Sequence, residues 1–292
     1  MRSNPSEYEL IAPGSLQAVV SLLATEPGTW LPIAGGTDLM VVYAAGKLSA
    51  RKLVSIWNLA ELRVIEILPG EVRIGAGCTY TDLRRNDIVA REFPLLASAA
   101  AWTGGIANQN RGTLGGNIVN ASPAADSLPA LLAYDAKLVL VSARGEREVP
   151  YGRFHQAYKK HALAPDELIR TIRLPSNFAD YISYSRKVGA RRAQAISKVC
   201  IAALASVHDG VIGDARIALG SVAPVPLRLT ETERLLIGKK PDPQLAQAAA
   251  KTVGAQIHPI DDIRSTIQYR AAVAANLVAE FVEALRSQAA TK

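Results

Sequence analysis

Two glycine-containing segments of the sequence carry residue types that could bind the phosphates of a nucleotide. The first, "PIAGGTDL" at residues 32–39, places two glycines, a threonine and an aspartate directly after an apolar run. The second, "TLGGN" at residues 113–117, again combines a hydroxyl, two glycines and an amide. Glycine lets a ligand approach the backbone, and successive N–H groups in a tight turn attract anions. For the first segment a structural alternative stays open, in which Thr37 or Asp38 caps a short helix.

An aspartate follows the second segment at the expected start of a helix. There, after a Ser-Pro dipeptide, the Asp126 carboxylate could cap the helix or accept a hydrogen bond from a ligand hydroxyl. In the structural alternative, Asn117 and Asn120 bond to the neighbouring backbone and Asp126 only caps. Two such segments in one chain instead favour a dinucleotide, with its pyrophosphate near a helix N-terminus.

Several other kinds of site are not supported. The Rossmann G-x-G-x-x-G fingerprint is absent, since "GAGCTY" at residues 75–80 has a tyrosine where close helix–strand packing needs a small residue. The sequence contains no Walker loop and no G-x-S-x-G nucleophile elbow. Its four histidines lack metal-ligand spacing, and His155 and His161 are expected in surface loops. No catalytic acid or base and no metal site is predicted.

Composition restricts the class of protein. The 292 residues suggest two domains, and 49% apolar with 20% charged residues is typical of globular proteins. No apolar run is long enough to span a membrane and no signal core is visible, so a cytoplasmic protein, or one exported only in complex with another, is expected. Cys78 and Cys200 lie in apolar sequence and are interpreted as structural thiols. They are too few for an iron–sulfur cluster, which takes four thiolates.

Part of the net charge of +7 lies in "SRKVGARRAQAISK" at residues 185–198, which holds five lysines and arginines. Nucleic-acid binding is disfavoured because no aromatic residue interleaves with this cluster. A partner subunit or an anionic cofactor accounts for it equally well. Elsewhere, Trp57 and Trp102 are expected to be packing residues.

The elements that would position the two segments begin with a strand–helix–strand pattern. Periodicity and turn residues predict strands at residues 8–13 and 29–36 around a helix at residues 15–28, with Ser15 as its N-cap. Further predictions are a strand at 51–58, hairpins at 64–77 and 136–150, a strand at 166–175, and helices at 79–104, broken near Pro94, and from Ser127 to Tyr134.

Beyond residue 176 the pattern is typical of a small antiparallel sheet with helices on one face, an α+β layout. Strands are predicted at residues 181–188, 195–207 and 211–222, with helices from Leu229 onward. The last helix is predicted from Asp261 to about Arg286, with an apolar face of Ile263, Ile267, Ala271, Ala274 and Leu277. The predicted domains are residues 1–176, with subdomains at about 1–58 and 59–176, and residues 177–292.

Three stretches carry a family resemblance. "AGGTDL", "TLGGNIVNASPAADSLPALLAYDAKLVL" and "YSRKVGARRAQAISKV" together make the chain similar to the flavin-binding subunit of the molybdenum hydroxylases, the xanthine dehydrogenase and carbon monoxide dehydrogenase family. The resemblance covers essentially the whole chain. It implies FAD held between two subdomains of a domain of the vanillyl-alcohol-oxidase type, not a Rossmann fold. A C-terminal α+β domain of the carbon monoxide dehydrogenase flavoprotein type would follow.

The resemblance also implies which residues contact FAD. The first segment would wrap the pyrophosphate and the second would face it from the other side. Asp126 would lie beside the ribityl and pyrophosphate groups, Ile169 and Ile196 near the isoalloxazine, and Lys187 would reach the cofactor from the C-terminal domain, the alternative being a solvated surface lysine. The full set of implied contacts is Pro32, Ile33, Ala34, Gly35, Gly36, Thr37, Asp38, Leu39, Thr113, Gly115, Gly116, Asn117, Asp126, Ile169, Lys187 and Ile196.

The implied activity is electron transfer within a heterotrimer. A large molybdopterin subunit would oxidise the substrate, and a small subunit with two [2Fe–2S] clusters would pass electrons to FAD in this chain. From there they would reach NAD⁺ or another acceptor. Alternatives are a stand-alone flavin-dependent oxidase and a flavin-free scaffold subunit. The substrate pocket would lie in another subunit, so no substrate is predicted.

Two departures from the family pattern lie near the flavin's expected open face. Gln109 stands where the family usually has an arginine ahead of Thr-x-Gly-Gly-Asn, and Arg111 is nearby instead. After the pair Arg191 and Arg192, which is interpreted as a subunit contact or an acceptor-side charge, Ala193 and Gln194 replace the usual acidic residues. These changes leave the electron acceptor open.

Overall fold

The computed structural model describes residues 4–191 and 194–289, and it begins with the predicted strand–helix–strand unit. A short 3-10 helix (Pro5–Glu7) precedes β1 (Glu9–Ile11), α1 (Leu16–Thr25), β2 (Trp30–Ile33), α2 (Leu39–Ala44) and β3 (Lys52–Ser55). The three strands form a parallel sheet in the order β1-β3-β2. As predicted, the Ser15 hydroxyl caps α1 by accepting a hydrogen bond from the Ala18 N–H.

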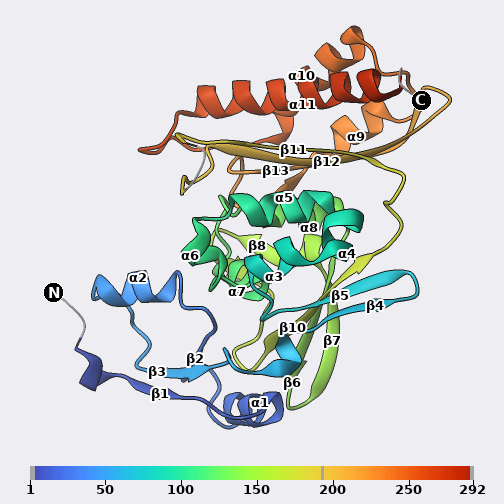
Figure 1. The fold of residues 1–292 in the computed structure, drawn as a ribbon. Coiled ribbons are helices and arrows are strands. Elements are labelled where there is room, and N and C mark those ends of the chain that lie inside the picture. The colour runs from blue at the N-terminus through green and yellow to red at the C-terminus, as the bar shows by residue number, and fades with distance from the viewer. Residues whose placement is uncertain (1–3, 192–193, 290–292) are drawn as a thin grey trace.

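A five-stranded antiparallel sheet follows, in the order β4-β5-β10-β6-β7. Its strands are β4 (Ile65–Leu68), β5 (Glu71–Gly75), β6 (Lys137–Ser142), β7 (Gly145–Pro150) and β10 (Leu168–Pro175), and 3-10 helices at Ala60–Leu62 and Tyr151–Arg153 flank it. Both predicted hairpins are present as β4–β5 and β6–β7. The strand β10 lies between them, so the sheet joins segments that are far apart in the sequence (Figure 1).

The helices between β5 and β6 differ from the prediction. They are α3 (Tyr80–Arg85), α4 (Asp87–Glu92), α5 (Pro94–Trp102), α6 (Ile106–Gln109), α7 (Leu114–Asn120) and α8 (Ser127–Ala133). Residues 79–104 therefore form three helices rather than two. The additional break occurs at Asn86, whose side chain accepts hydrogen bonds from the N–H groups of Ile88 and Val89 and so starts a new helix.

The two histidines expected in surface loops are instead half-buried in a small hairpin of β8 (His155–Ala157) and β9 (Lys160–His161). A ring nitrogen of His155 lies 2.8 Å from the Ile118 carbonyl oxygen, and the His161 ring stacks on Phe154 with centroids 5.4 Å apart. The interpretation as surface loop residues was wrong because both imidazoles take part in packing beside α7. No group of histidine, cysteine and carboxylate side chains that could hold a metal occurs among the described residues.

The C-terminal part is an antiparallel sheet of β11 (Ile182–Val188), β12 (Val199–His208), β13 (Val211–Gly220) and β14 (Leu227–Arg228). The helices α9 (Thr230–Leu236), α10 (Pro243–Gln256) and α11 (Ile267–Ala289) complete it. The helices α9 and α11 pack on one face of the sheet and α10 packs against both of them, while the other face is turned toward α5 and α8 (Figure 1). The strand β12 starts at Val199 rather than at residue 195.

The last helix starts at Ile267, six residues later than predicted. Asp262 accepts hydrogen bonds from the N–H groups of Arg264 and Ser265, which form a tight turn, and Asp261 accepts one from the Ile267 N–H. As a result Ile263 is 98% exposed and is not part of the apolar face. That face is made by Ala274, Leu277, Val278, Phe281, Val282 and Leu285.

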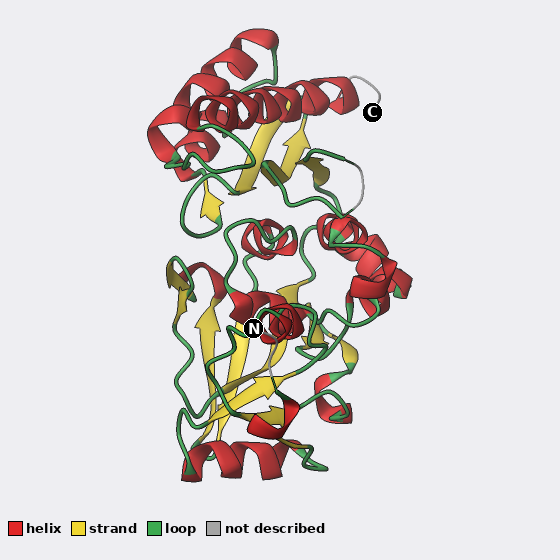
Figure 2. Cartoon of the chain, turned by 90° about the vertical axis from the view of Figure 1, so that its left-hand side faces the viewer, coloured by secondary structure: helices red, strands yellow, loops and turns green. Residues whose placement is uncertain are grey.

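The two halves stack end to end and share a hydrophobic core (Figure 2). Ala202, Leu204 and Ala218 of the C-terminal sheet pack into the cluster that also holds α8 and β10. Separate clusters lie under α10 and α11, and beneath α1. None of the described helices has the length and apolar content needed to cross a membrane.

Both cysteines are buried, which supports the interpretation as structural thiols. Burial raises the pKa of the Cys78 thiol to about 12 and the pKa of Cys200 far above its usual range. Since the thiolate is the reactive form, we expect neither thiol to react with a disulfide reagent in the folded protein. Thiol titration should detect neither cysteine in the folded protein and both cysteines after denaturation. Rapid reaction of the folded chain would contradict their burial.

Candidate functional site

The two glycine-containing segments meet in the structure. The first forms a turn between β2 and α2, at the carboxyl edge of the parallel sheet (Figure 1). A Cβ atom added to Gly35 would lie 1.6 Å from the carbonyl oxygen of Arg111, just before the second segment. Gly36 has a φ of +74°, a conformation that side chains with a Cβ rarely adopt. Glycine is therefore required at position 35 by the close approach and favoured at position 36 by the backbone conformation.

The turn leaves a row of backbone donors open. Among the described residues, none accepts a hydrogen bond from the N–H groups of Gly35, Gly36, Thr37 or Asp38. Asp38 makes no side-chain cap on α2, and the Thr37 hydroxyl makes no hydrogen bond to a described residue. The capping alternative for this segment is therefore wrong. Four successive free N–H groups in one turn are the chemistry that binds an anionic oxygen.

The second segment starts a helix rather than forming the open tight turn that its glycines suggested. Thr113 is the N-cap of α7, and its hydroxyl accepts a hydrogen bond from the Gly116 N–H at 3.1 Å. The N–H groups of Gly115 and Asn117 bond to the carbonyl oxygens of Ala76 and Thr113. Gly115 is needed because a Cβ there would lie 2.6 Å from that of Ala76. The N–H groups of residues 114–117 are thus already used by the protein, whereas no described residue accepts a hydrogen bond from the Thr113 N–H.

Asp126 and Lys187 form a buried ion pair between the two halves of the chain. Lys187 Nζ lies 2.6 Å from Asp126 Oδ2 and 3.0 Å from the carbonyl oxygen of Trp102. The hydroxyl of Ser197 donates to the other carboxylate oxygen. The two charged side chains are only 7% and 8% exposed. Lys187 is therefore not a solvated surface lysine, and Asp126 does not cap α8.

Burial raises the pKa of the Asp126 carboxyl, and the Lys187 ammonium and the Ser197 hydroxyl oppose this rise. Ser127, the residue directly after Asp126, donates a hydrogen bond to Asn117 Oδ1 of the second segment and also contacts the hydroxyl of Tyr80. The ion pair is therefore fixed relative to α7.

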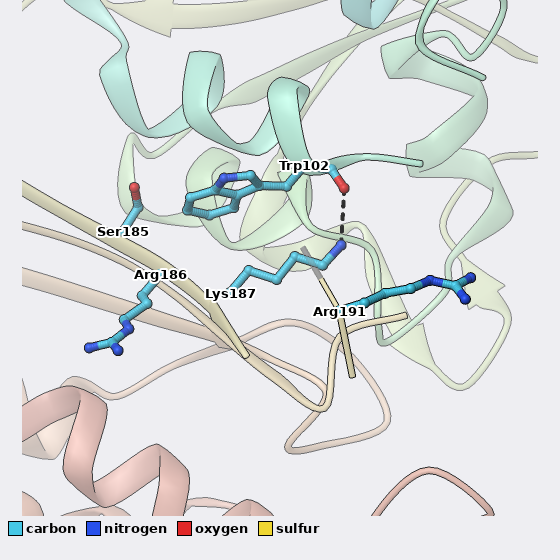
Figure 3. Close-up of a pocket in the computed structure, with 5 residues that line it drawn as sticks. All are labelled: Trp102, Ser185, Arg186, Lys187 and Arg191. Atoms are coloured by element: carbon cyan, nitrogen blue, oxygen red, sulfur yellow. Dashed lines mark hydrogen bonds between the residues drawn. The ribbon is translucent and has the colours of Figure 1, made fainter. Parts of the chain in front are cut away.

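A cavity of about 340 Å³ opens beside this ion pair (Figure 3). Its lining residues are Trp102, Ser185, Arg186, Lys187 and Arg191. Three of these residues, Ser185 to Lys187, lie on β11. The indole of Trp102, at the end of α5, lies beside Ser185, the first of the three (Figure 3). The side chain of Arg191 points away from the others (Figure 3). Arg186 is paired with Glu280 of α11. The cavity thus combines an aromatic surface with positive charge.

Of the sixteen expected contacts, only Lys187 lines this cavity, and the two expected near the isoalloxazine do not. Ile169 is 4% exposed and lies on β10 in the shared core, whereas Ile196 is 52% exposed in the segment before β12. Gln109 is 2% exposed, and its amide group bonds to Ala101 and Arg84, which is a structural role. Arg192 and Ala193 lie outside the described residues.

Some site residues were missed from the sequence. Ser197 was not singled out, although it directly follows Ile196, and Trp102 and Trp57 were assigned to packing alone. Trp102 instead lines the cavity. The guanidinium carbon of Arg111 lies 3.9 Å from the centroid of the Trp57 ring. No local sequence signal identifies such pairs, because their members are distant in the chain.

Comparison with known proteins agrees with this geometry. Residues 6–177 match the FAD binding domain in molybdopterin dehydrogenase, and residues 184–285 match the CO dehydrogenase flavoprotein C-terminal domain. The xanthine dehydrogenase FAD-binding subunit of Escherichia coli O157:H7 is 33% identical over 88% of either chain. The glyceraldehyde dehydrogenase medium chain of Sulfolobus acidocaldarius is also 33% identical, over 91% of this chain and 94% of the relative.

Among solved structures, a chain of carbon monoxide dehydrogenase from Hydrogenophaga pseudoflava superimposes with a TM-score of 0.91 at 30% identity, covering 96% of both chains. The predicted fold class is thus confirmed as the FAD-binding type of this family, with small sheets and no Rossmann arrangement.

Proposed function

Because this chain belongs to the FAD-binding subunits of the molybdenum hydroxylases, we propose that it carries electrons between partner subunits and a final acceptor. The partners would be a large molybdopterin subunit and a small subunit with [2Fe–2S] clusters, in a cytoplasmic heterotrimer. The final acceptor would be NAD⁺ or another electron acceptor. The bound FAD supplies the redox chemistry, and the chain supplies binding, orientation and electrostatics.

The observation that carries the proposal is the turn of residues 35–38, whose four N–H groups have no acceptor in the described part of the chain. These donors and the Thr37 hydroxyl would hold the pyrophosphate of FAD, together with the rest of the segment at residues 32–39. The N–H groups of Gly115 and Gly116 would support this turn from α7, and the Thr113 N–H and the Asn117 side-chain amide would donate to the cofactor. Free donors are hard to reconcile with a flavin-free scaffold.

The flavin ring would lie toward the ion pair. We propose that Lys187 and Asp126 fix the C-terminal domain, residues 177–292, against the FAD-binding domain, residues 1–176, at the ring's edge. Ile196 is exposed and remains a proposed contact, and Ile169 would offer only its small exposed part. The residues that line the cavity include no carboxylate or histidine, so they offer no base for a stand-alone oxidase.

The purified chain is expected to be yellow. Its absorbance spectrum should show bands near about 370 and about 450 nm, and heating should release about one FAD per chain. Reconstitution with FAD should restore the bands after the cofactor has been removed. A chain that stays colourless and takes up no FAD, even with both partner subunits present, would refute the proposal.

A further inference from the structure

We propose that Arg111 is a phosphate-binding residue for the FAD pyrophosphate, positioned by Trp57, and that Arg63 on the same indole has no such role. This inference rests on the proposed function. Arg111 would supply a positive charge for the pyrophosphate. The first turn cannot supply one, since residues 32–39 include an aspartate and no lysine or arginine.

The backbone places Arg111 at the junction of the two segments. Its carbonyl oxygen contacts Gly35, and the next residues lead into the N-cap of α7. Trp57 follows the end of β3 and lies next to the same turn. The N–H of the preceding Ile56 donates a hydrogen bond to the carbonyl oxygen of Ile33, two residues before Gly35. Both residues therefore adjoin the turn with the free N–H groups.

The side chain of Arg111 is held but not neutralised. Its guanidinium carbon lies 3.9 Å from the Trp57 ring centroid, and no described residue accepts a hydrogen bond from its guanidinium or forms an ion pair with it. Stacking on an indole uses the face of the guanidinium and leaves the N–H groups at its edge available. Those groups match the geometry of two phosphate oxygens.

Arg63 provides an internal comparison. Its guanidinium carbon lies 4.7 Å from the centroid of the same ring, but the group also pairs with Asp82 at 3.5 Å. Its charge is therefore already compensated by a carboxylate. Two arginines thus share one indole, and only Arg111 retains an uncompensated charge beside the glycine turn.

The backbone hydrogen bonds strengthen the assignment. The N–H groups of residues 114–117 are used by the protein, so the second segment can contribute only the Thr113 N–H and side chains to the cofactor. A preorganised arginine loses little conformational freedom when a phosphate binds, which increases its contribution to affinity. Neutral donors from the first turn and one cation from Arg111 would then face the pyrophosphate together.

The test measures the affinity of the cofactor-free protein for FAD by fluorescence at low and at high salt. We expect Arg111→Ala to weaken binding by about 10- to 100-fold at low salt, and the loss to shrink at high salt because exposed charges are screened. Arg111→Lys should retain part of the affinity. The matched variant Arg63→Ala should bind FAD within about twofold of the unchanged protein.

Arg111→Gln is the second variant should the alanine protein not fold. The inference is overturned if both neutral variants bind FAD like the unchanged protein, if their loss is the same at all salt concentrations, or if Arg63→Ala loses as much. Competition by ADP and adenosine adds a further criterion, because only ADP should bind more weakly to the Arg111 variants. Failure of the unchanged protein to bind FAD would instead refute the proposed function.

Discussion

Replacing Gly35 with alanine is expected to abolish tight FAD binding and to destabilise the fold. The new Cβ would lie 1.6 Å from the carbonyl oxygen and 2.4 Å from the carbonyl carbon of Arg111. Backbone atoms cannot rotate away as the end of a flexible side chain can. The turn and the segment before α7 must therefore separate, and this should cost about 3 kcal/mol of unfolding free energy.

The same separation moves the free donors of residues 35–38 away from the position of the pyrophosphate. We expect a loss of FAD affinity of at least about tenfold, which corresponds to about 1.4 kcal/mol of binding free energy. Equilibrium denaturation and FAD titration of the cofactor-free protein measure the two effects separately. The matched control is Gly14→Ala, because nothing lies within 4 Å of a Cβ at Gly14.

Gly14→Ala should leave FAD affinity unchanged and should change stability by less than about 1 kcal/mol. If Gly35→Ala behaved like this control, the two glycine segments would not be in contact in solution.

Replacing Lys187 with methionine is expected to destabilise the protein by about 3–5 kcal/mol near neutral pH, because it leaves the buried Asp126 carboxylate without its counter-charge. Only 8% of the Lys187 side chain and 7% of the Asp126 side chain are exposed, so little water could solvate the unpaired carboxylate. The matched control is Lys137→Met, since Lys137 pairs with Glu148 with 52% and 34% of the side chains exposed. That change should cost less than about 1 kcal/mol.

The destabilisation by Lys187→Met should depend on pH. Burial already raises the pKa of Asp126 above its usual 3.8, and removal of the ammonium raises it further. The folded variant then binds a proton more tightly than the unfolded chain does, so its stability falls as pH rises through the raised pKa and recovers in acid. Chemical denaturation at about pH 5 and about pH 8 should show a larger loss at the higher value.

The double variant Asp126→Asn with Lys187→Met removes both charges. It should be more stable than Lys187→Met alone at the higher pH, and the additional pH dependence should disappear. Equal stability of Lys187→Met and Lys137→Met at both pH values would show that the ion pair is not buried in solution.

Local elements of the fold were predictable because their signals lie within a few residues. Ser15 caps α1, Pro69-Gly70 turns the β4–β5 hairpin, and the glycines after β2 end that strand. The family was also predictable, since the glycine segments are contiguous in the sequence and the matched family regions cover most of the chain.

Predictions failed where distant residues compete for the same backbone groups. The glycines of the segment at Thr113 suggested an open tight turn, but the structure shows a helix start. There the Cys78 and Ala76 carbonyl oxygens accept hydrogen bonds from Leu114 and Gly115, and Gly115 permits close packing on β5. The same glycine that signals an open turn therefore serves tight packing here, and only its neighbours in space distinguish the two roles.

The sequence by itself determined the order of the strands β1 to β7 and β10 to β13, the position of the glycine segment at residues 32–39, and the family. The tertiary structure decided the pairs that define the site. Lys187 meets Asp126 across 61 residues, and Arg111 meets Trp57 across the boundary between two sheets. Hydrogen-bond capping and periodicity act over one or two turns of chain, whereas charge compensation and stacking depend on distances in space. Those distances are fixed only when the separate layers pack.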